Sequence, residues 1–231
     1  MGAIGRKNKS EEVREVPFKK TGILTDMSVH DIEKMIADHY GIRSNLIVPN
    51  VSWGFFNGHE ADLVVITPAG YLTEIEIKRS WSDFLADFGK REYHDDPRIS
   101  AFFYAVPECM VEPCKEYLND TEWEAGKLCP GVIGYRTLNE SKFRQAWVAW
   151  PSVVPYKAQK LSDDDMYQIA RLGTLRYWSL LDKLRTAEEK NMRITKEVAL
   201  SNEVSRLKAI LCEIKADYKE ITGETWRMEV Y

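Results

Sequence analysis

Hydrophobic and polar positions alternate most regularly over residues 71–78, and this pattern predicts a β-strand with two distinct faces. The preceding run, residues 62–67, is rich in Val and Ile and also favours a strand. A Pro-Ala-Gly sequence at residues 68–70 lies between the two runs and favours a turn. We therefore expect an antiparallel hairpin that brings Asp62, at the start of the first strand, close to Glu76 near the end of the second.

The other periodic segments predict a mixed α/β core around this hairpin. Strands are predicted over residues 46–53, 62–67, 71–78, 99–106, 131–136 and 143–148, and helices over residues 28–40, after Ser80, and over residues 112–119. Ser28 and Asp31 form a helix-start signal, and Gly41 ends the same helix. Pro49 indicates that the first strand lies at a sheet edge or contains a bulge. The apolar run 99–106 is typical of a buried parallel strand that follows a crossover helix.

The pattern changes to a helical one beyond an irregular segment at residues 150–160. A helix is predicted from Ser162 to about residue 190, and residues 200–221 carry apolar side chains at alternating intervals of four and three. This heptad seam is typical of a short coiled coil with a second copy. The open alternatives are an α-hairpin with the preceding helix and a single amphipathic helix that packs on the core. The expected parts are a flexible arm over residues 1–25, a core domain over residues 26–150 and a helical extension over residues 160–231.

Composition limits the functional classes. The 231 residues are 44% hydrophobic and 29% charged, and the net charge of −4 argues against a protein that coats nucleic acid through bulk charge. No apolar run is long enough for a membrane span, and we expect no membrane contact. Cys109, Cys114, Cys129 and Cys212 lack paired spacing, which favours reduced thiols in the cytoplasm over a zinc site. Without a glycine-rich phosphate loop, a nucleophile elbow or a dinucleotide fingerprint, the sequence gives no support to an ATPase, an α/β-hydrolase or a dehydrogenase.

The charged face of the hairpin suggests a metal site. Asp62, Glu76 and Lys78 are expected on a shared face, where two carboxylates and one ammonium would meet. Mg²⁺ and Mn²⁺ prefer oxygen ligands and retain water for substrate phosphates. The alternative is a solvated strand face, because exposed strands often carry Glu and Lys.

The order of these residues resembles the PD-(D/E)xK nuclease superfamily, whose signature is an Asp followed by (Asp/Glu)-x-Lys. Asp62 and Glu76-Ile77-Lys78 match that signature. A longer string resembles the MmcB-like branch of DNA-repair nucleases. That string comprises Ala61-Asp62-Leu63-Val64, Glu74-Ile75-Glu76-Ile77-Lys78-Arg79-Ser80, Asp83-Phe84, Asp87, Lys90, Tyr93 and Phe102-Phe103-Tyr104-Ala105-Val106-Pro107. The resemblance covers residues 28–136, and Ala61 stands where the superfamily name has proline.

The resemblance implies a fold and an activity. The fold is a restriction-endonuclease-like α/β core, with a mixed central sheet flanked by helices, and in this chain a C-terminal helical extension follows it. The activity is that of a Mg²⁺- or Mn²⁺-dependent endodeoxyribonuclease acting on DNA in repair, recombination or phage DNA processing, in the cytoplasm of a bacterial or phage-infected cell. The alternative is a catalytically silent DNA-binding or assembly module that retains the nuclease fold. The seam over residues 200–221 leaves a homo-oligomer open in either case.

The resemblance also assigns the site residues. Asp62, Glu76 and the backbone carbonyl of Ile77 would ligate the metal, and Lys78 would help to position the attacking water. Glu33, on the first predicted helix, would complete the metal site. The residues expected beside the substrate are Ser80, Lys90 and Tyr93.

Overall fold

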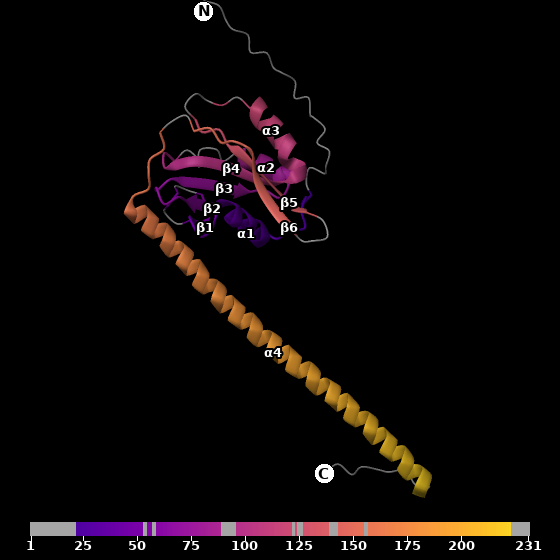
Figure 1. The fold of residues 1–231 in the computed structure, drawn as a ribbon. Coiled ribbons are helices and arrows are strands. Elements are labelled where there is room, and N and C mark those ends of the chain that lie inside the picture. Colours follow the sequence, from indigo (N-terminus) through magenta and orange to yellow (C-terminus); the bar gives the residue numbers. More distant parts are fainter. Residues whose placement is uncertain are drawn as a thin grey trace, which may run out of the picture. The chain divides into compact units, whose positions relative to one another are not determined.

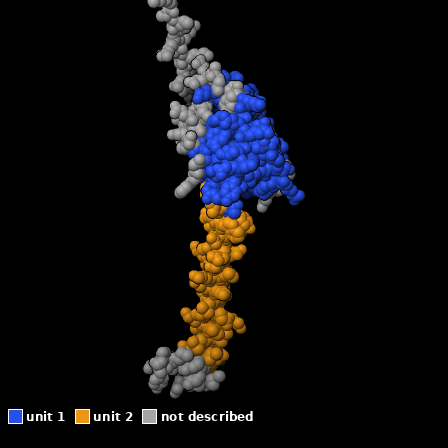
Figure 2. All heavy atoms as spheres, turned by 90° about the vertical axis from the view of Figure 1, so that its left-hand side faces the viewer, with its two compact units in different colours: residues 1–174 blue, residues 175–231 orange. Residues whose placement is uncertain are grey.

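The computed structural model describes residues 22–52, 55–56, 59–88, 96–121, 123, 127–138, 143–154 and 157–222. The chain divides into two compact units, residues 1–174 and residues 175–231 (Figure 2). The predicted flexible arm over residues 1–25 lies almost wholly outside the described residues.

A six-stranded mixed sheet forms the centre of the first unit (Figure 1). In chain order, which is also their order in the sheet, the strands are β1 (Leu46–Val51), β2 (Ala61–Ile66), β3 (Leu72–Ile77), β4 (Ile99–Pro107), β5 (Gly131–Leu138) and β6 (Phe143–Trp150). The pairs β1–β2, β2–β3 and β5–β6 are antiparallel, whereas β3–β4 and β4–β5 are parallel. All six predicted strands are confirmed, and Pro49 lies on an edge strand, where a missing N–H donor is tolerated.

Helices accompany the sheet, and the ends of the first follow the sequence signals. They are α1 (Val29–Tyr40), α2 (Trp81–Asp87), α3 (Val111–Asp120) and α4 (Asp163–Thr222), with a short 3₁₀ turn, η2 (Glu108–Met110). The Ser28 hydroxyl accepts a hydrogen bond from the Asp31 N–H at 3.1 Å, which caps the start of α1. Gly41 ends the helix in the left-handed region, at a φ of 78°.

Both faces of the sheet are covered by apolar side chains. The cluster on the α1 face includes Ile32, Ile36, Leu63, Ile75, Ile77 and Ile133, and the cluster on the opposite face includes Leu72, Phe84, Phe102, Tyr104, Met110 and Leu118. The strand β3 is therefore buried on both faces. Its carboxylates at Glu74 and Glu76 point into the protein, which also excludes the alternative of a solvated strand face.

The first turns of α4 belong to the core of the first unit. Ile169 is fully buried, and Leu161, just before the helix, donates its backbone N–H to the Gly70 carbonyl at 2.9 Å. Gly173 allows a close approach to β1, because a Cβ there would lie only 3.3 Å from the Val48 side chain. The core of the sheet domain thus continues into α4.

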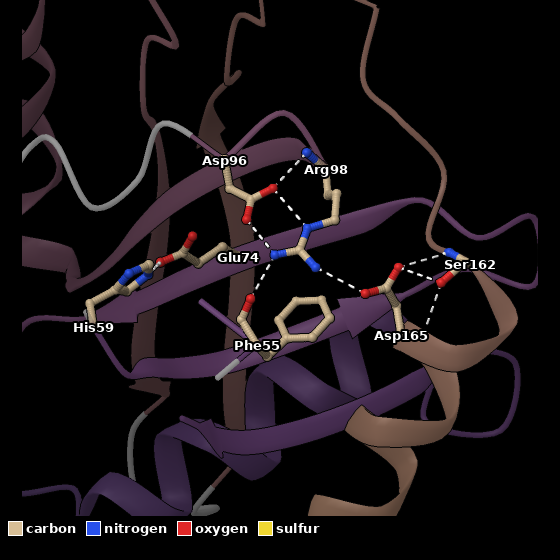
Figure 3. A network of polar contacts seen from close by, with 7 residues as sticks. All are labelled: Phe55, His59, Glu74, Asp96, Arg98, Ser162 and Asp165. Carbon is tan, nitrogen blue, oxygen red and sulfur yellow. Dashed lines mark hydrogen bonds and ion pairs between the residues drawn. The ribbon is translucent and has the colours of Figure 1, made fainter. Parts of the chain in front are cut away.

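Arg98 ties three separate segments together at the start of α4 (Figure 3). Its guanidinium donates to the Asp96 carboxylate at 2.6 Å, the Phe55 carbonyl at 2.6 Å and the Asp165 carboxylate at 2.9 Å. The guanidinium carbon also lies 4.3 Å from the centre of the Phe55 ring. Ser162 and Asp165 exchange hydrogen bonds across the first turn, so the predicted helix start at Ser162 is confirmed.

α4 is one continuous helix of 60 residues. The polar stretch over residues 186–197 continues the helix, because its Lys, Glu and Arg side chains are good helix formers. No turn separates the two predicted helical segments, so the α-hairpin alternative is wrong. Within the described ranges, no helix combines the length and the apolar character needed to cross a membrane.

The start of β5 gives a test of this packing. A Cβ on Gly131 would lie 2.5 Å from the Phe103 ring and 2.6 Å from the backbone nitrogen of Ser152. We expect Gly131→Ala to lower the free energy of unfolding by about 1–3 kcal/mol, because backbone atoms cannot move aside as a flexible side chain can. Urea denaturation followed by circular dichroism measures the change. The control is Thr137→Ala at an exposed position of the same strand, and equal stabilities of the two variants would contradict the packing.

Candidate functional site

The β2–β3 hairpin places Asp62 beside the end of β3. Leu63 pairs with Ile75, and the strands run antiparallel. The same register, continued by one residue, sets Asp62 opposite Glu76. The Oδ2 atom of Asp62 accepts a hydrogen bond from the Ile77 backbone N–H at 2.8 Å, which holds this half-buried carboxylate against β3. The structure thus brings the two carboxylates together in the way that the hairpin pattern predicts.

Lys78 forms a buried ion cluster with Glu76 and Asp87. Its Nζ atom lies 3.0 Å from Glu76 Oε2 and 3.0 Å from Asp87 Oδ1. Tyr104, on β4, donates its hydroxyl to Asp87 Oδ2 at 3.0 Å, and the centre of its ring is 5.9 Å from the Lys78 Nζ. Lys78, Glu76 and Asp87 are each only 5–6% exposed. The ammonium is therefore held by two carboxyl groups inside the protein, where an unpaired charge would be strongly unfavourable.

The sequence pattern assigns no role to Asp87, although it is one of the two carboxylates that hold Lys78. A signal is nevertheless present in α2. Asp87 follows Trp81 by six residues and Phe84 by three, so it falls on the buried stripe of this helix. An aspartate on such a stripe requires compensation of its charge, which the ammonium of Lys78 and the hydroxyl of Tyr104 provide.

Burial and neighbouring charges change the pKa values of the three predicted groups. Burial, and then the charge of Asp62, raise the pKa of Glu76 to about 8, an effect that Lys78 only partly offsets. Burial likewise raises the pKa of Asp62, against the opposing N–H of Ile77. Burial alone would lower the pKa of Lys78, but Glu76 and Asp87 outweigh it and raise that pKa. Lys78 is thus a fixed positive charge at neutral pH, whereas the pKa of Glu76 lies close to neutral pH.

Glu33 lies at the edge of this arrangement. Its negative charge is one of those that raise the pKa of Asp62, so α1 places it within electrostatic range. The carboxylate is buried, with Oε2 2.9 Å from His30 Nδ1, and Oε1 accepts a hydrogen bond from the Asn50 amide at 3.5 Å. Glu33 therefore stands near the site, but its oxygens are also engaged by α1 and β1.

Only one of the three residues expected beside the substrate is among the described residues. Ser80 is the N-cap of α2, and its buried hydroxyl accepts a hydrogen bond from the Asp83 N–H at 3.2 Å. This hydroxyl therefore has a structural role at the start of the helix. Lys90 and Tyr93 lie outside the described residues.

The carboxyl oxygens of Asp62 and Glu76 fit a hard divalent cation that takes few protein ligands. The Oε1 atom of Glu76 is buried and has no hydrogen-bond partner within the described part of the chain. The same part contains no group of three or more His, Cys, Asp or Glu side chains that could hold a metal ion. Mg²⁺ commonly keeps several waters and binds through one or two carboxylates, which the pair of Asp62 and Glu76 can supply. The four cysteines are free thiols.

A second buried polar pair lies on the same face of β3, two residues before Glu76 (Figure 3). His59 Nε2 is 2.8 Å from Glu74 Oε1, and the His59 ring lies against Phe56 with the ring centres 4.7 Å apart. The charge of Glu74 contributes to the raised pKa of Glu76. The sequence does not indicate this pair, because His59 precedes β2 and no spacing rule links it to Glu74.

Comparisons with known proteins do not assign the chain to a family. No family model matches it, and no curated protein matches it. A solved structure of a protein of unknown function from Silicibacter pomeroyi is similar, with 20% sequence identity over 71% of this chain and 96% of that chain. The TM-score is 0.42, and a likeness at this level carries no argument about function.

The raised pKa of Glu76 predicts how stability depends on pH in the metal-free protein. Glu76 has an ordinary pKa of 4.5 and a folded-state pKa of about 8, so the folded state binds the additional proton between these values. The free energy of unfolding should therefore fall as pH rises through this window, by at most about 1.4 kcal/mol per pH unit from this group. We expect Glu76→Gln to remove this decrease and to gain stability relative to the parent as pH rises. Thermal unfolding in a chelating buffer measures it, and parallel pH profiles of parent and variant would contradict the assignment.

Removal of Asp87 tests the buried ion cluster. We expect Asp87→Ala to lower the free energy of unfolding by about 3–5 kcal/mol, because it leaves a buried ammonium with one carboxylate and the Tyr104 hydroxyl without its acceptor. Asp87→Asn keeps an acceptor for Tyr104 and should cost less. Asp38→Asn, at an exposed position of α1, serves as the control in the same urea titration. A loss for Asp87→Ala no larger than that of the control would show that the cluster does not hold.

Proposed function

We propose that the chain is a metal-dependent nuclease that hydrolyses phosphodiester bonds of DNA in the cytoplasm of a bacterial or phage-infected cell. One observation carries the proposal: Asp62, Glu76 and Lys78 meet at the end of β3, and the buried Oε1 of Glu76 has no hydrogen-bond partner among the described residues. These residues and their order in the chain are those of the PD-(D/E)xK resemblance.

The arrangement of the first unit supports the same class. Its mixed sheet is flanked by helices, as expected for the restriction-endonuclease-like core that the resemblance implies. The carboxylate pair lies where the antiparallel hairpin joins the parallel part of the sheet, since β3 pairs with β2 on one side and with β4 on the other. The pair also lies near the carboxyl ends of the parallel strands, where open α/β sheets commonly bind ligands.

Asp62 and Glu76 would hold Mg²⁺ or Mn²⁺, with the backbone carbonyl of Ile77 as a further oxygen ligand. When bound, such a cation polarises a phosphoryl oxygen and lowers the pKa of a water molecule. The Ile77 N–H keeps the Asp62 carboxylate turned toward β3 before any ligand binds. Because the pKa of Glu76 is about 8, this carboxyl group would release a proton on binding at neutral pH.

Lys78 acts in this scheme as a fixed charge and a hydrogen-bond donor. Its raised pKa makes it a poor proton acceptor, and Glu76 and Asp87 hold its ammonium at the site. A positive charge there would stabilise the negative charge that develops on the phosphoryl group in the transition state. Asp87 is then a positioning residue, which acts on the reaction through the orientation of Lys78.

A second candidate is favoured by the burial of the same lysine. Lys78 is only 5% exposed and already has two carboxylate partners, as expected for a cluster that stabilises the fold. A catalytically silent DNA-binding or assembly module that retains the nuclease fold would keep such a cluster. This candidate predicts DNA binding without cleavage and without specific binding of Mn²⁺.

The two candidates are separated by cleavage and binding assays. We expect the protein to cleave labelled plasmid, single-stranded or branched DNA with Mg²⁺ or Mn²⁺ and to stop on chelation. Asp62→Asn, Glu76→Gln and Lys78→Met should each reduce the rate by about 100-fold or more, because each removes an interaction that acts in the transition state. Asp38→Asn is the matched surface control, and circular dichroism verifies that each variant is folded.

Equal cleavage by the parent and the three site variants would end the nuclease proposal, because it would indicate a contaminating activity. Calorimetric titration with Mn²⁺ gives an independent measurement. Absence of Mn²⁺ binding, together with DNA binding that is unchanged in Glu76→Gln, would favour the silent module. Binding of Mn²⁺ to the parent with proton release, lost in Glu76→Gln, would support the nuclease.

A further inference from the structure

The second unit presents an apolar stripe that no described residue of that unit covers. Every described side chain from residue 175 to residue 217 is exposed except Leu211 and Lys215, which are half-buried. Leu200 and Leu207 are 68% and 55% exposed. Isolated helices are marginally stable in water, and most helix stability in proteins comes from packing of an apolar face. The stripe therefore has the character of a surface that packs on another helix.

The spacing of the stripe fits a second copy of the same helix. Leu200, Val204, Leu207, Leu211 and Ile214 recur at alternating intervals of four and three, which places them at heptad positions d, a, d, a and d. Val204 at position a, with Leu200 and Leu207 at position d, favours two strands, whereas Leu211 at position a and Ile214 at position d favour three or four. The two-stranded state therefore rests on the first part of the seam. The heptad frame also fixes which charged residues flank the seam.

We propose that the protein is a homodimer in which the two α4 helices form a parallel coiled coil through this seam. Glu203 and Asp217 occupy g positions, and Lys208 and Lys215 occupy e positions. In a parallel pair each g residue faces the e residue five positions later in the other helix, so Glu203 meets Lys208 of the second copy. In an antiparallel pair, g faces g and e faces e, so lysine would meet lysine and acid would meet acid. The flanking charges thus select the parallel orientation.

The part of α4 that precedes this seam also favours the parallel orientation. A second series recurs at intervals of four and three, in a heptad frame that is offset by one residue from the first. It comprises Leu180, Leu184, Ala187, Asn191, Ile194 and Val198. In this frame Lys183 occupies a g position and Glu188 the e position five residues later, again a complementary pair only in the parallel orientation. Asn191 occupies an a position, where a polar residue fixes the register of a two-stranded coiled coil.

The dimer is independent of the proposed nuclease function, and its test requires no enzymatic activity. Sedimentation of the full chain under reducing conditions should give twice the 26.7 kDa mass of one chain. Leu207→Asp should return the mass to that of one chain, whereas Ala209→Asp, at the outward-facing f position, should leave the dimer intact. A single-chain mass for the parent, or a dimer that survives Leu207→Asp, would overturn the proposal.

Orientation is tested by charge reversal and by crosslinking. Glu203→Lys should raise the dimer dissociation constant by roughly ten-fold, because two attractive pairs become repulsive, and the double variant Glu203→Lys/Lys208→Glu should restore it. Glu203 also lies 3.5 Å from Arg206 of its own helix, a contact that the double variant disrupts equally. Leu200→Cys, at the end of the seam, with Cys109 and Cys212 replaced by Ser, should form a disulfide between the two copies on mild oxidation, because only a parallel pair brings these ends together. A dimer without this disulfide would overturn the parallel orientation.

Discussion

A buried ammonium held between two carboxyl groups constrains the centre of this protein. Lys78, at the end of β3, forms an ion pair with Asp87 from α2, and Asp87 in turn accepts a hydrogen bond from the hydroxyl of Tyr104 on β4. The backbone N–H of Lys78 also donates to the Ala105 carbonyl at 2.9 Å, so the lysine is fixed at both its main chain and its side chain. An unpaired charge in such a place costs several kcal/mol, roughly the margin by which a domain of this size is stable. The strand, the crossover helix and the next strand therefore have to assemble together.

Local signals in the sequence are sufficient for the secondary structure and for part of the site. The alternation along β3 separates its two faces correctly, and the hairpin register that follows from it sets Asp62 opposite Glu76. The alternation does not show whether other elements of the protein cover each face of the strand. The same period of two is found in a strand with one solvated face and in a strand whose polar face is covered by a helix. Glu76 is linked to α2 through Lys78 and Asp87, and Glu74 contacts His59, so the burial of both carboxyl groups is a property of the tertiary structure.

The features that the sequence does not reveal depend on partners far apart in the chain. Asp87 lies on the apolar stripe of α2, but its role follows only once Lys78 and Tyr104 are placed beside it. His59 is similar, because its contact with Glu74 joins a residue before β2 to the middle of β3. The continuity of α4 is hidden from the sequence pattern for a different reason. A run of charged residues interrupts the hydrophobic periodicity, although the same residues favour a helix and keep it continuous.

The contact between Leu161 and Gly70 changes what counts as an autonomous folding unit. The tip of the β2–β3 hairpin is closed by a hydrogen bond from the segment that leads into α4, and Asp165 in the first turn of that helix anchors Arg98. A fragment that stops before Leu161 would leave the hairpin tip open to solvent and Ile169 missing from the core. The shortest fragment that retains an intact interior therefore extends to about Thr174, the last residue of the first unit, which lies within α4.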